Sequence, residues 1–463
     1  MADLNIRNGK IFFGNRLIEA GLSIKDGKII AIAKDGSLPP AEKTIDASGR
    51  IIVPGAIDVH THIEDLDYSE REDFITGTQA AASGGVTTIL EMPVGIEGKS
   101  ALEAFDLQLD IMRKRCIVDF GIIGAAGYNN IDSIREFSRR GVVGFKTFMT
   151  NPPEEEAELR NLAAKDDYFL SKIFSEIAQT GLVSSVHAEN DAIVTHEVER
   201  LKSEGRKDFQ AHTESRPAIA EDEACLRAIL LAHQANVSLN LVHMSSKNAF
   251  EIIREAKYRR CNITCEITPH HLFLTCEDGN KIGSWAKVDP PLRQKEHVMA
   301  AWKALNDRTI DMIASDHSPY HPDEKNIALR NSNIFECGSG TPGVETLIPV
   351  MLDAVNNNKI SLERLVCVTS ENPAKRFALY PRKGTIAINA DADLLILNMK
   401  EEYILKNEMM FTKPKITVFN GMKVRGSIEK TIIRGTVVYD KGKFCVKEGY
   451  GNFITPQRIL MEE

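Results

Sequence analysis

The amino-acid sequence predicts an α/β fold, a (β/α)8 TIM barrel that carries a small β-sandwich domain built from both chain ends. Three observations lead to this prediction: eight apolar strand-like runs, helical patterns between them, and β-rich segments at the two ends of the chain. Apolar runs that alternate with amphipathic helices are typical of parallel βα units. Eight such units over roughly 320 residues fit a closed barrel.

The two ends of the chain share one pattern. Short strands joined by turns fill the first 54 residues, as in LNIRNGKIFF and GRIIVPG, and the C-terminal segment returns to this style in GTIAINADADLLILN and KTIIRGTVVYDKGKFCV. We therefore expect residues 1–54 and 381–463 to form the two parts of the β-sandwich domain. Residues 55–380 would then form the barrel as the catalytic domain.

Within the barrel segment, helical patterns such as EDFITGTQAAASGG separate the strand-like runs, and their glycine endings suit helix C-caps. Longer intervals before the sixth strand and between the seventh and eighth predict loop insertions over one mouth of the barrel. The candidate strands are residues 56–63, 87–93, 118–126, 144–149, 182–189, 238–245, 262–269 and 310–317.

Composition limits the classes of function. The chain is 43% hydrophobic and 26% charged, and its net charge of -8 offers no basic surface for nucleic acid. The N-terminus lacks the apolar core of a signal peptide, and no apolar run approaches the roughly 18 residues that cross a bilayer. We therefore expect a cytoplasmic protein without membrane contact. The eight cysteines are scattered and are predicted to be free thiols.

In barrels of this kind, reactive groups project from the C-terminal ends of the strands. His60 and His62 lie two residues apart on the first strand, so both imidazoles share one face about 7 Å apart and can bind one metal ion. A single interior histidine would be read as structural, but six candidate ligands at equivalent ends predict a metal site. They are His60, His62, Lys146, His187, His243 and Asp316.

Lys146 stands in the middle of the apolar stretch GFKTFMT. Burying an unpaired ammonium group costs several kcal/mol unless it finds a partner or loses its charge. The other candidate ligands include one carboxylate, which is too little negative charge for two divalent ions. A neutral buried amine can add carbon dioxide and become an anionic carbamate, N6-carboxylysine, that bridges two metals. A salt bridge inside the barrel is the alternative.

Asp316 closes the apolar run IDMIASDHSP, where the chain enters a Ser-Pro loop. Beside a metal ion, this carboxylate would act as a ligand and as the catalytic general base, because a base must lie within hydrogen-bond reach of the proton it takes. The alternative is a cap on the following segment.

These six positions and their order resemble the cyclic-amide hydrolases of the amidohydrolase superfamily, which include hydantoinases, allantoinases, dihydropyrimidinases and dihydroorotases. The resemblance covers nearly the whole chain and includes PGAIDVHTHI, SGGVTTILEMP, GFKTFM, VHAEN, EITPHHLFLT, KVDPPLR and IASDHSP. It implies a small-molecule cyclic ureide as substrate, and a homodimer or homotetramer.

The same resemblance assigns roles to the six residues. It implies that His60, His62 and Asp316 bind one divalent metal ion, that His187 and His243 bind another, and that carboxylated Lys146 bridges them. Zinc fits nitrogen-rich ligation best, and manganese, cobalt or iron are other occupants. A hydroxide shared by the metals would attack the ring amide carbonyl, and Asp316 would pass its proton to the leaving nitrogen.

Departures from the family patterns narrow the choice of substrate ring. Related dihydroorotases follow the His-x-His pair with an arginine that grips the substrate carboxylate, whereas Ile63-Glu64-Asp65 follows here, with Arg71 further on. D-hydantoinases and dihydropyrimidinases typically carry a tyrosine shortly after the lysine strand, and FMTNPPEE has none. The stretches DFITGTQAAASGGVTTILEMP and ASDHSPYHPDEK resemble allantoinases, and SVHAEN and ERLVCVTSENPAKRFALYPRKGT resemble L-hydantoinase-type enzymes.

We therefore expect a cyclic amidohydrolase that acts on allantoin or a related hydantoin. Hydantoinase, dihydropyrimidinase or dihydroorotase activity is the alternative within the family. From other classes, a non-catalytic scaffold on the same fold and a mononuclear deaminase remain as alternatives.

Two loops are predicted to select the substrate, one around Asp289-Pro290-Pro291 and one over residues 338–343. Glycines there let the backbone approach a planar ring, although an ordinary lid turn is the alternative. His317 would point to the other face if the strand continued past Asp316, and the pair His270-His271 is a candidate for a supporting or substrate-contact role. The predicted substrate contacts are Asp289, Gly338, Ser339 and Gly340.

Overall fold

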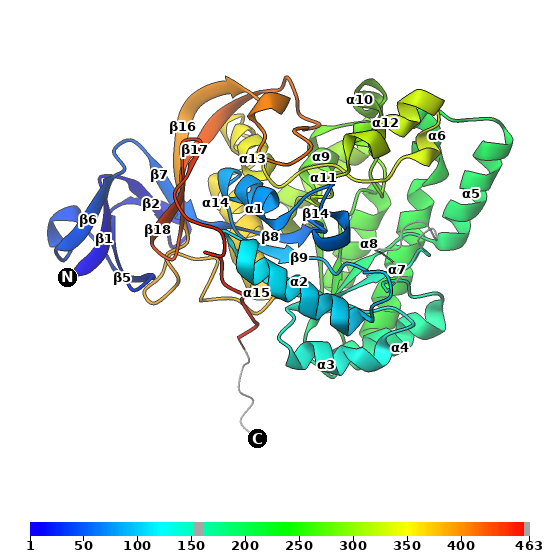
Figure 1. Ribbon diagram of the computed structural model, residues 1–463, viewed down its shortest axis with the longest axis horizontal. Helices are drawn as coiled ribbons and strands as arrows, with labels where there is room; N and C mark the ends of the chain where they lie inside the picture. Colours follow the sequence, from blue (N-terminus) through cyan, green and yellow to red (C-terminus); the bar gives the residue numbers. More distant parts are fainter. Residues whose placement is uncertain (152–158, 160, 458–463) are drawn as a thin grey trace.

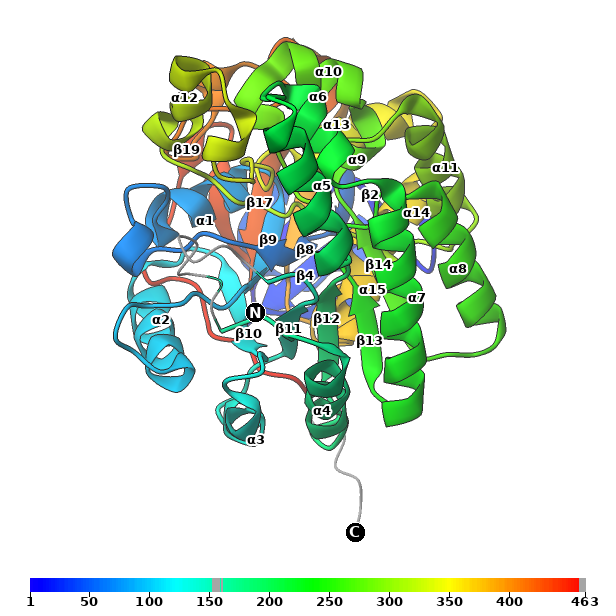
Figure 2. The ribbon, with the colours of Figure 1, turned by 90° about the vertical axis from the view of Figure 1, so that its right-hand side faces the viewer.

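The computed structural model describes residues 1–151, 159 and 161–457. Its centre is an 8-stranded parallel sheet in the order β15-β14-β13-β12-β11-β10-β9-β8, surrounded by helices (Figures 1 and 2). A parallel bridge between Thr61, at the end of β8, and His317, just past β15, joins the two edges of this sheet. The predicted (β/α)8 barrel is confirmed.

All eight predicted barrel strands are present, and each ends one to four residues before its predicted end. The backbone leaves the extended conformation early, as at His243 and Asp316, which have φ values of 39° and 50°. Side chains just past the strand ends therefore turn into the mouth of the barrel. The strands are β8 Ala56–Thr61, β9 Val86–Glu91, β10 Asp119–Ala125, β11 Gly144–Phe148, β12 Val183–His187, β13 Ser238–Leu241, β14 Ile263–Ile267 and β15 Met312–Ile313.

Several helices begin at side-chain caps that the sequence supplies. Asp73 accepts hydrogen bonds from the backbone N–H groups of Ile75 and Thr76 at the start of α1, and Asn190 caps α5 in the same way. The loop insertion predicted before the sixth strand contains α5 and α6, and the insertion between the seventh and eighth contains α9 and α10. The helices are α1 Phe74–Ser83, α2 Ala101–Arg115, α3 Ile134–Arg139, α4 Asp167–Ala178, α5 Asp191–Ser203, α6 Phe209–Ser215, α7 Ala218–Ala235, α8 Lys247–Tyr258, α9 Pro269–Phe273, α10 Cys276–Ile282, α11 Lys295–Asn306, α12 Pro322–Asn331, α13 Leu347–Asn356, α14 Leu362–Val366 and α15 Asn372–Arg376.

Two further sheets come from the chain ends and lie to one side of the barrel (Figure 1). A 4-stranded sheet has the order β5-β4-β1-β6, and a 7-stranded sheet has the order β19-β18-β17-β16-β7-β2-β3. Their strands are β1 Ala2–Arg7, β2 Lys10–Phe13, β3 Arg16–Glu19, β4 Gly21–Lys25, β5 Lys28–Ala33, β6 Ala41–Asp46, β7 Ile51–Pro54, β16 Leu394–Ile404, β17 Lys423–Ile433, β18 Thr436–Asp440 and β19 Lys443–Phe444.

The antiparallel pairing of β7 with β16 joins the N-terminal and C-terminal strands, as predicted. Leu22 and Ile52 from the first segment pack in one buried cluster with Ile396 and Ile432 from the last. Only Gly55 separates β7 from β8. A Cβ atom there would lie 2.2 Å from the Thr87 hydroxyl, so this close passage from one sheet to the next requires glycine. The exact limits proposed for the three segments stay a prediction.

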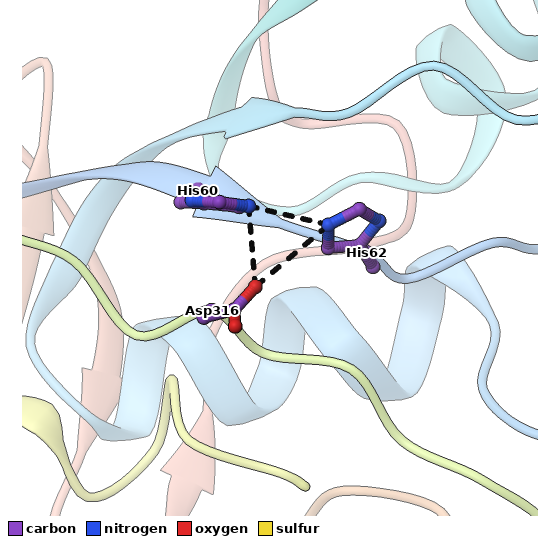
Figure 3. A group of neighbouring side chains, drawn as sticks. All are labelled: His60, His62 and Asp316. Carbon is purple, nitrogen blue, oxygen red and sulfur yellow. Dashed lines mark hydrogen bonds and ion pairs between the residues drawn. The ribbon is translucent and has the colours of Figure 1, made fainter. Parts of the chain in front are cut away.

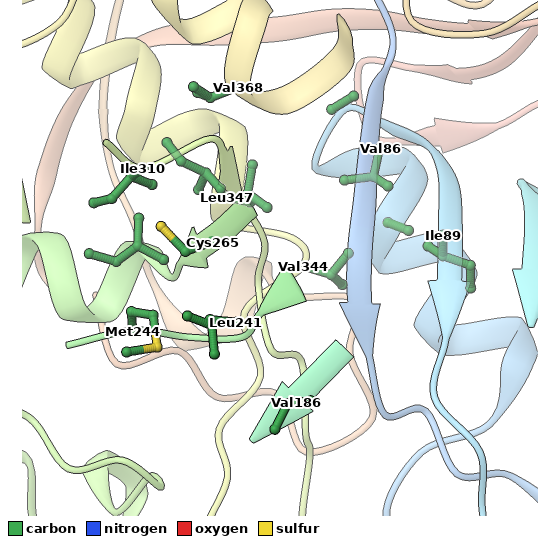
Figure 4. Close-up of a cluster of buried hydrophobic side chains, with 14 of the residues drawn as sticks. Val86, Ile89, Val186, Leu241, Met244, Cys265, Ile310, Val344, Leu347 and Val368 are labelled. Atoms are coloured by element: carbon green, nitrogen blue, oxygen red, sulfur yellow. The ribbon is translucent and has the colours of Figure 1, made fainter. Parts of the chain in front are cut away.

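The barrel wall packs against the helices through apolar side chains. Figure 4 shows Val86 and Ile89 of β9, Leu241 of β13 and Cys265 of β14 in one buried cluster with Leu347 of α13. Burial of this kind holds the strand ends, and the groups they carry, in fixed positions. The eight cysteines are free, as predicted. Among the described helices, none combines the length and apolar character that a membrane span requires.

Candidate metal and active site

The mouth of the barrel brings together all six residues that the sequence singles out as ligands. His60, Lys146 and His187 lie within β8, β11 and β12, whereas His62, His243 and Asp316 lie one, two and three residues past the ends of β8, β13 and β15. The side chain of Asp316 is 14% exposed, while the other five residues are buried. Six polar groups thus face one small, nearly dry space.

One group of three ligand atoms is formed by His60, His62 and Asp316 (Figure 3). The Nε2 atoms of His60 and His62 lie 3.3 Å apart. Asp316 Oδ1 lies 3.1 Å from His60 Nε2 and 3.8 Å from His62 Nε2. Two imidazole nitrogens and one carboxylate oxygen that face each other at these distances are a donor set that a divalent ion such as zinc takes.

The second group lies beside the first. His187 Nδ1 and His243 Nε2 are 3.1 Å apart, and the His60 and His243 ring centroids are 5.4 Å apart. Lys146 Nζ lies 3.1 Å from His60 Nε2 and 5.0 Å from the centroid of the Phe148 ring. The Phe148 ring in turn stacks on His187.

Burial decides the protonation of these groups. It lowers the pKa of His60 and of His243 well below the usual range, and the positive charges of Lys146 and His187 add to this effect. Neutral imidazoles offer lone pairs to a cation. Burial also lowers the pKa of Lys146 to about 8, against the opposing effect of Asp316 and Glu266. The donor set therefore fits divalent metal ions.

The sequence profile described as the amidohydrolase family matches residues 51–438. The chain belongs to the amidohydrolase family. This confirms the resemblance found in the sequence.

Individual relatives cover nearly the full length of this amidohydrolase. The L-hydantoinase of Paenarthrobacter aurescens is 37% identical over 98% of both chains, and the allantoinase of Rubrobacter xylanophilus is 36% identical over 98% of both. A dihydroorotase of Methanosarcina acetivorans is 35% identical over 100% of this chain and 97% of its own. The solved structure of the L-hydantoinase from Arthrobacter aurescens superposes with a TM-score of 0.94, at 37% identity over 98% of this chain and 100% of its own. All three named activities open cyclic amides, but on different rings.

Sequence reasoning missed the residues of the amidohydrolase that contact and position these candidate ligands. His187 Nε2 lies 2.8 Å from Glu189 Oε2, and Arg216 forms an ion pair with the same carboxylate oxygen. Burial alone would raise the pKa of Glu189, but Arg216 and the bond to His187 outweigh it and hold that pKa at about 2. Glu189 follows His187 by two residues at a strand end, so the period of two was a signal for it.

A similar arrangement supports His60. Glu266 Oε1 lies 3.5 Å from His60 Nδ1 and accepts a hydrogen bond of 3.0 Å from Asn240 Nδ2. Burial raises the pKa of Glu266 to about 8, although Lys146 opposes this rise. Nothing in the one-dimensional pattern joins these residues, because β8, β13 and β14 meet only in the closed barrel.

The predicted substrate-contact residues lie in two loops that are tied to each other. Asp289 forms an ion pair of 2.8 Å with Arg216. The N–H of Gly340 donates to the carbonyl of Lys287 at 2.9 Å, and Lys325 Nζ donates to the carbonyl of Gly338 at 2.8 Å. Ser339, between the two glycines, is partly exposed. Contact of these loops with a substrate stays a prediction.

The three remaining histidines of interest have separate roles. His317 lies outside the ligand group: the strand ends before Asp316, and His317 Nδ1 accepts from the N–H of Gly343 at 3.1 Å. His271 joins two loops, since its ring nitrogens lie 2.8 Å from Thr268 Oγ1 and 3.0 Å from the Pro290 carbonyl. His270 is buried beside the His271 ring.

Proposed function

We propose that this amidohydrolase is a binuclear metal-dependent hydrolase that opens the cyclic amide ring of allantoin or a related hydantoin. The observation that carries the proposal is the convergence of four histidines, one carboxylate and one buried lysine at the mouth of the barrel. The similarity to an L-hydantoinase and to an allantoinase, at 37% and 36% identity, supports the class of ring.

His60, His62 and Asp316 would hold one divalent ion, and His187 and His243 the other. Lys146 would lie between them as N6-carboxylysine. In that modification the neutral Nζ attacks the carbon of carbon dioxide, a C–N bond forms, and the nitrogen releases a proton, which leaves an anionic group with two oxygens. A pKa of about 8 makes the neutral amine accessible near neutral pH. Zinc suits the histidine nitrogens, and manganese, cobalt or iron would also fit.

When bound, the metal pair supplies Lewis-acid polarisation of the ring carbonyl and activation of water. Asp316 would accept the proton of the nucleophile and deliver it to the ring nitrogen as the amide C–N bond breaks and a C–O bond forms. Its side chain is 14% exposed and lies among the ligands, so it can reach both the bound water and the substrate. Burial raises the pKa of Asp316, which favours a carboxylate that takes up a proton.

The residues around His62 favour a substrate ring that carries no carboxylate. Glu64 stands where related dihydroorotases carry an arginine, and its Oε1 lies 3.4 Å from His62 Nδ1. The Arg71 guanidinium forms ion pairs with Glu324 at 2.8 Å and with Glu64 at 3.3 Å. A substrate carboxylate would have to displace these partners. Dihydroorotase activity is the second candidate, favoured by the relative of 35% identity.

A substrate panel tests the proposal. The protein, reconstituted with zinc, manganese or cobalt and bicarbonate, is assayed with allantoin, D- and L-5-substituted hydantoins, dihydrouracil and dihydroorotate. We expect kcat/KM for allantoin or a hydantoin to exceed that for dihydroorotate by about tenfold or more, equivalent to about 1.4 kcal/mol. A preference for dihydroorotate would contradict the proposed substrate ring and support dihydroorotase activity. Bound metal without any turnover would favour the non-catalytic scaffold.

We also propose that the protein is a homodimer or homotetramer located in the cytoplasm. Light scattering of the purified protein gives the mass to compare with the 51.4 kDa of one chain. A monomeric mass would contradict the first part of this proposal.

A further inference from the structure

We propose that Glu189, Arg216 and Asp289 form a positioning chain that sets the ring of His187 for metal binding and connects it to the loop carrying Asp289. The inference rests on the proposed metal site. Its contacts run without a gap, from His187 Nε2 to Glu189 Oε2 at 2.8 Å, from Glu189 to Arg216, and from Arg216 Nη2 to Asp289 Oδ2 at 2.8 Å.

The first step is the choice between the two nitrogens of His187. Glu189 is buried and forms an ion pair with Arg216, so it is a carboxylate that accepts a hydrogen bond and does not donate one. The Nε2 of His187 must therefore carry the proton, which leaves the lone pair on Nδ1. That atom lies 3.1 Å from His243 Nε2, so it faces the second ligand of the same proposed ion. Carboxylate support of this kind orients metal-binding histidines and raises their basicity.

The second step is the role of Arg216. An isolated buried carboxylate is costly, and the Arg216 guanidinium, which contacts the same oxygen of Glu189 as His187 does, offsets the charge and fixes the position of Glu189. Arg216 directly follows α6, in the connection to α7, so this cation comes from the inserted segment and not from a barrel strand. Phe148 stacks on the His187 ring with planes 18° apart and limits its rotation. Ring plane, proton position and charge are thus each fixed by a different neighbour.

The third step is the position of Asp289 at the surface of the barrel mouth. Asp289 is 21% exposed, whereas Glu189 is 1% exposed. Arg216 lies between the two carboxylates, so the loop predicted to contact substrate is connected to a proposed metal ligand through one guanidinium. A change at Asp289 should therefore alter metal binding even when no substrate is present.

The main test replaces Glu189 with glutamine and measures metal affinity by competition with a chelator. We expect Glu189→Gln to weaken binding of one of the two ions by about 10- to 100-fold, to change the visible absorption of the cobalt form, and to lower kcat with little change in KM. Glu189→Asp keeps the charge and should recover part of the affinity. Glu214→Gln is the matched control, because Glu214 lies on α6 in a surface ion pair with Arg206.

Asp289→Asn separates the positioning role from direct substrate contact. A positioning role predicts weaker metal binding in the absence of substrate, whereas pure substrate contact predicts normal metal binding and a higher KM. Arg216→Lys keeps the charge but loses the two-sided fork, and should fall between the wild type and Glu189→Gln.

Unchanged metal affinity in a folded Glu189→Gln protein, checked by circular dichroism, would overturn the inference. Wild-type protein that binds two ions but opens none of the rings would refute the proposed substrate class and leave this test intact. Wild-type protein that binds no metal would refute both.

Discussion

Two buried lysines, Lys146 and Lys383, show two uses of the same ammonium group. Lys383 is 1% exposed, and its Nζ lies 2.5 Å from carboxylate oxygens of Asp119 and Asp393 and 3.2 Å from Asp391. Lys146 is also buried, but within the described residues no carboxylate lies in ion-pair distance of its Nζ, which instead contacts His60. One amine is a fixed cation and the other is left available for reaction.

The location of each lysine on the barrel explains the difference. Asp119 opens β10 at the end of the barrel opposite the site, while Asp391 and Asp393 come just before β16, so Lys383 binds the barrel to the outer sheets. The three carboxylates resemble a cation site in geometry, yet Lys383 already fills it. At the strand ends, burial serves chemistry instead. A buried lysine indicates function only when the groups around it are known.

The largest expected effect follows from Lys146→Ala. Loss of the bridging group should lower kcat/KM by about 10³-fold or more, since both ions lose a shared ligand. Stability should fall by less than in a variant that breaks a buried ion pair, because Nζ contacts the His60 ring and, within the described residues, no carboxylate. Short carboxylic acids added to the assay should restore part of the activity. Steady-state kinetics measures the change in activity, and thermal unfolding measures the change in stability. Full activity in the variant would refute the proposed carbamate on Lys146.

Lys383→Met should show the reverse pattern. Asp393 loses the lysine that it pairs with, whereas Asp119 keeps Arg434 and Asp391 keeps Arg382. The free energy of unfolding should therefore fall by about 3 kcal/mol, the lower end of the range for a broken buried pair. Activity per folded molecule should stay near that of the wild type. Denaturant unfolding measures the loss. The control is Lys28→Met, which removes a pair between Asp391 and a lysine that is 47% exposed and should cost under about 1 kcal/mol. Equal losses in both variants would contradict the comparison.

The smallest effect concerns pH. Because the pKa of Lys146 is about 8 and not 10.5, the neutral fraction of its amine rises tenfold per pH unit below about 8 and then levels off. Reactivation of metal-free protein at constant dissolved carbon dioxide should follow this curve, with carbamate detected by ¹³C NMR. Between pH 8 and 10.5 the unfolded chain binds more protons, so the stability of the unmodified protein should rise with pH. A reactivation midpoint near 10.5 would show that burial leaves the amine unperturbed.

The sequence predicts the barrel well because its signals are local. Apolar runs, helical patterns and capping residues such as Asp73 identify the elements, and the rule that reactive groups follow strand ends identifies His60, His187 and Asp316. The strand ends themselves are missed, because the left-handed backbone at His243 and Asp316 leaves no mark on hydrophobic periodicity.

The supporting residues are missed for a different reason. Glu189 and Arg216 lie apart in the sequence, and nothing in the pattern joins them to Asp289, which the sequence predicts only as a substrate contact. Only the folded chain shows that Arg216 lies between the two carboxylates. The sequence also does not predict the cluster of Asp119, Asp391 and Asp393 around Lys383, since Asp119 and Lys383 are distant in sequence.

The pairing of β7 with β16 also sets an order for biosynthesis. Pro54 and Leu394 are partners although about 340 residues separate them. At about 5–20 residues per second, a ribosome takes on the order of 20–70 s to make the intervening chain. During that time the edge of β7 and apolar residues such as Ile52 lack their final neighbours, which exposes them to other nascent chains. The 7-stranded sheet, which needs strands from both chain ends, should therefore be the last part to become protected from hydrogen exchange.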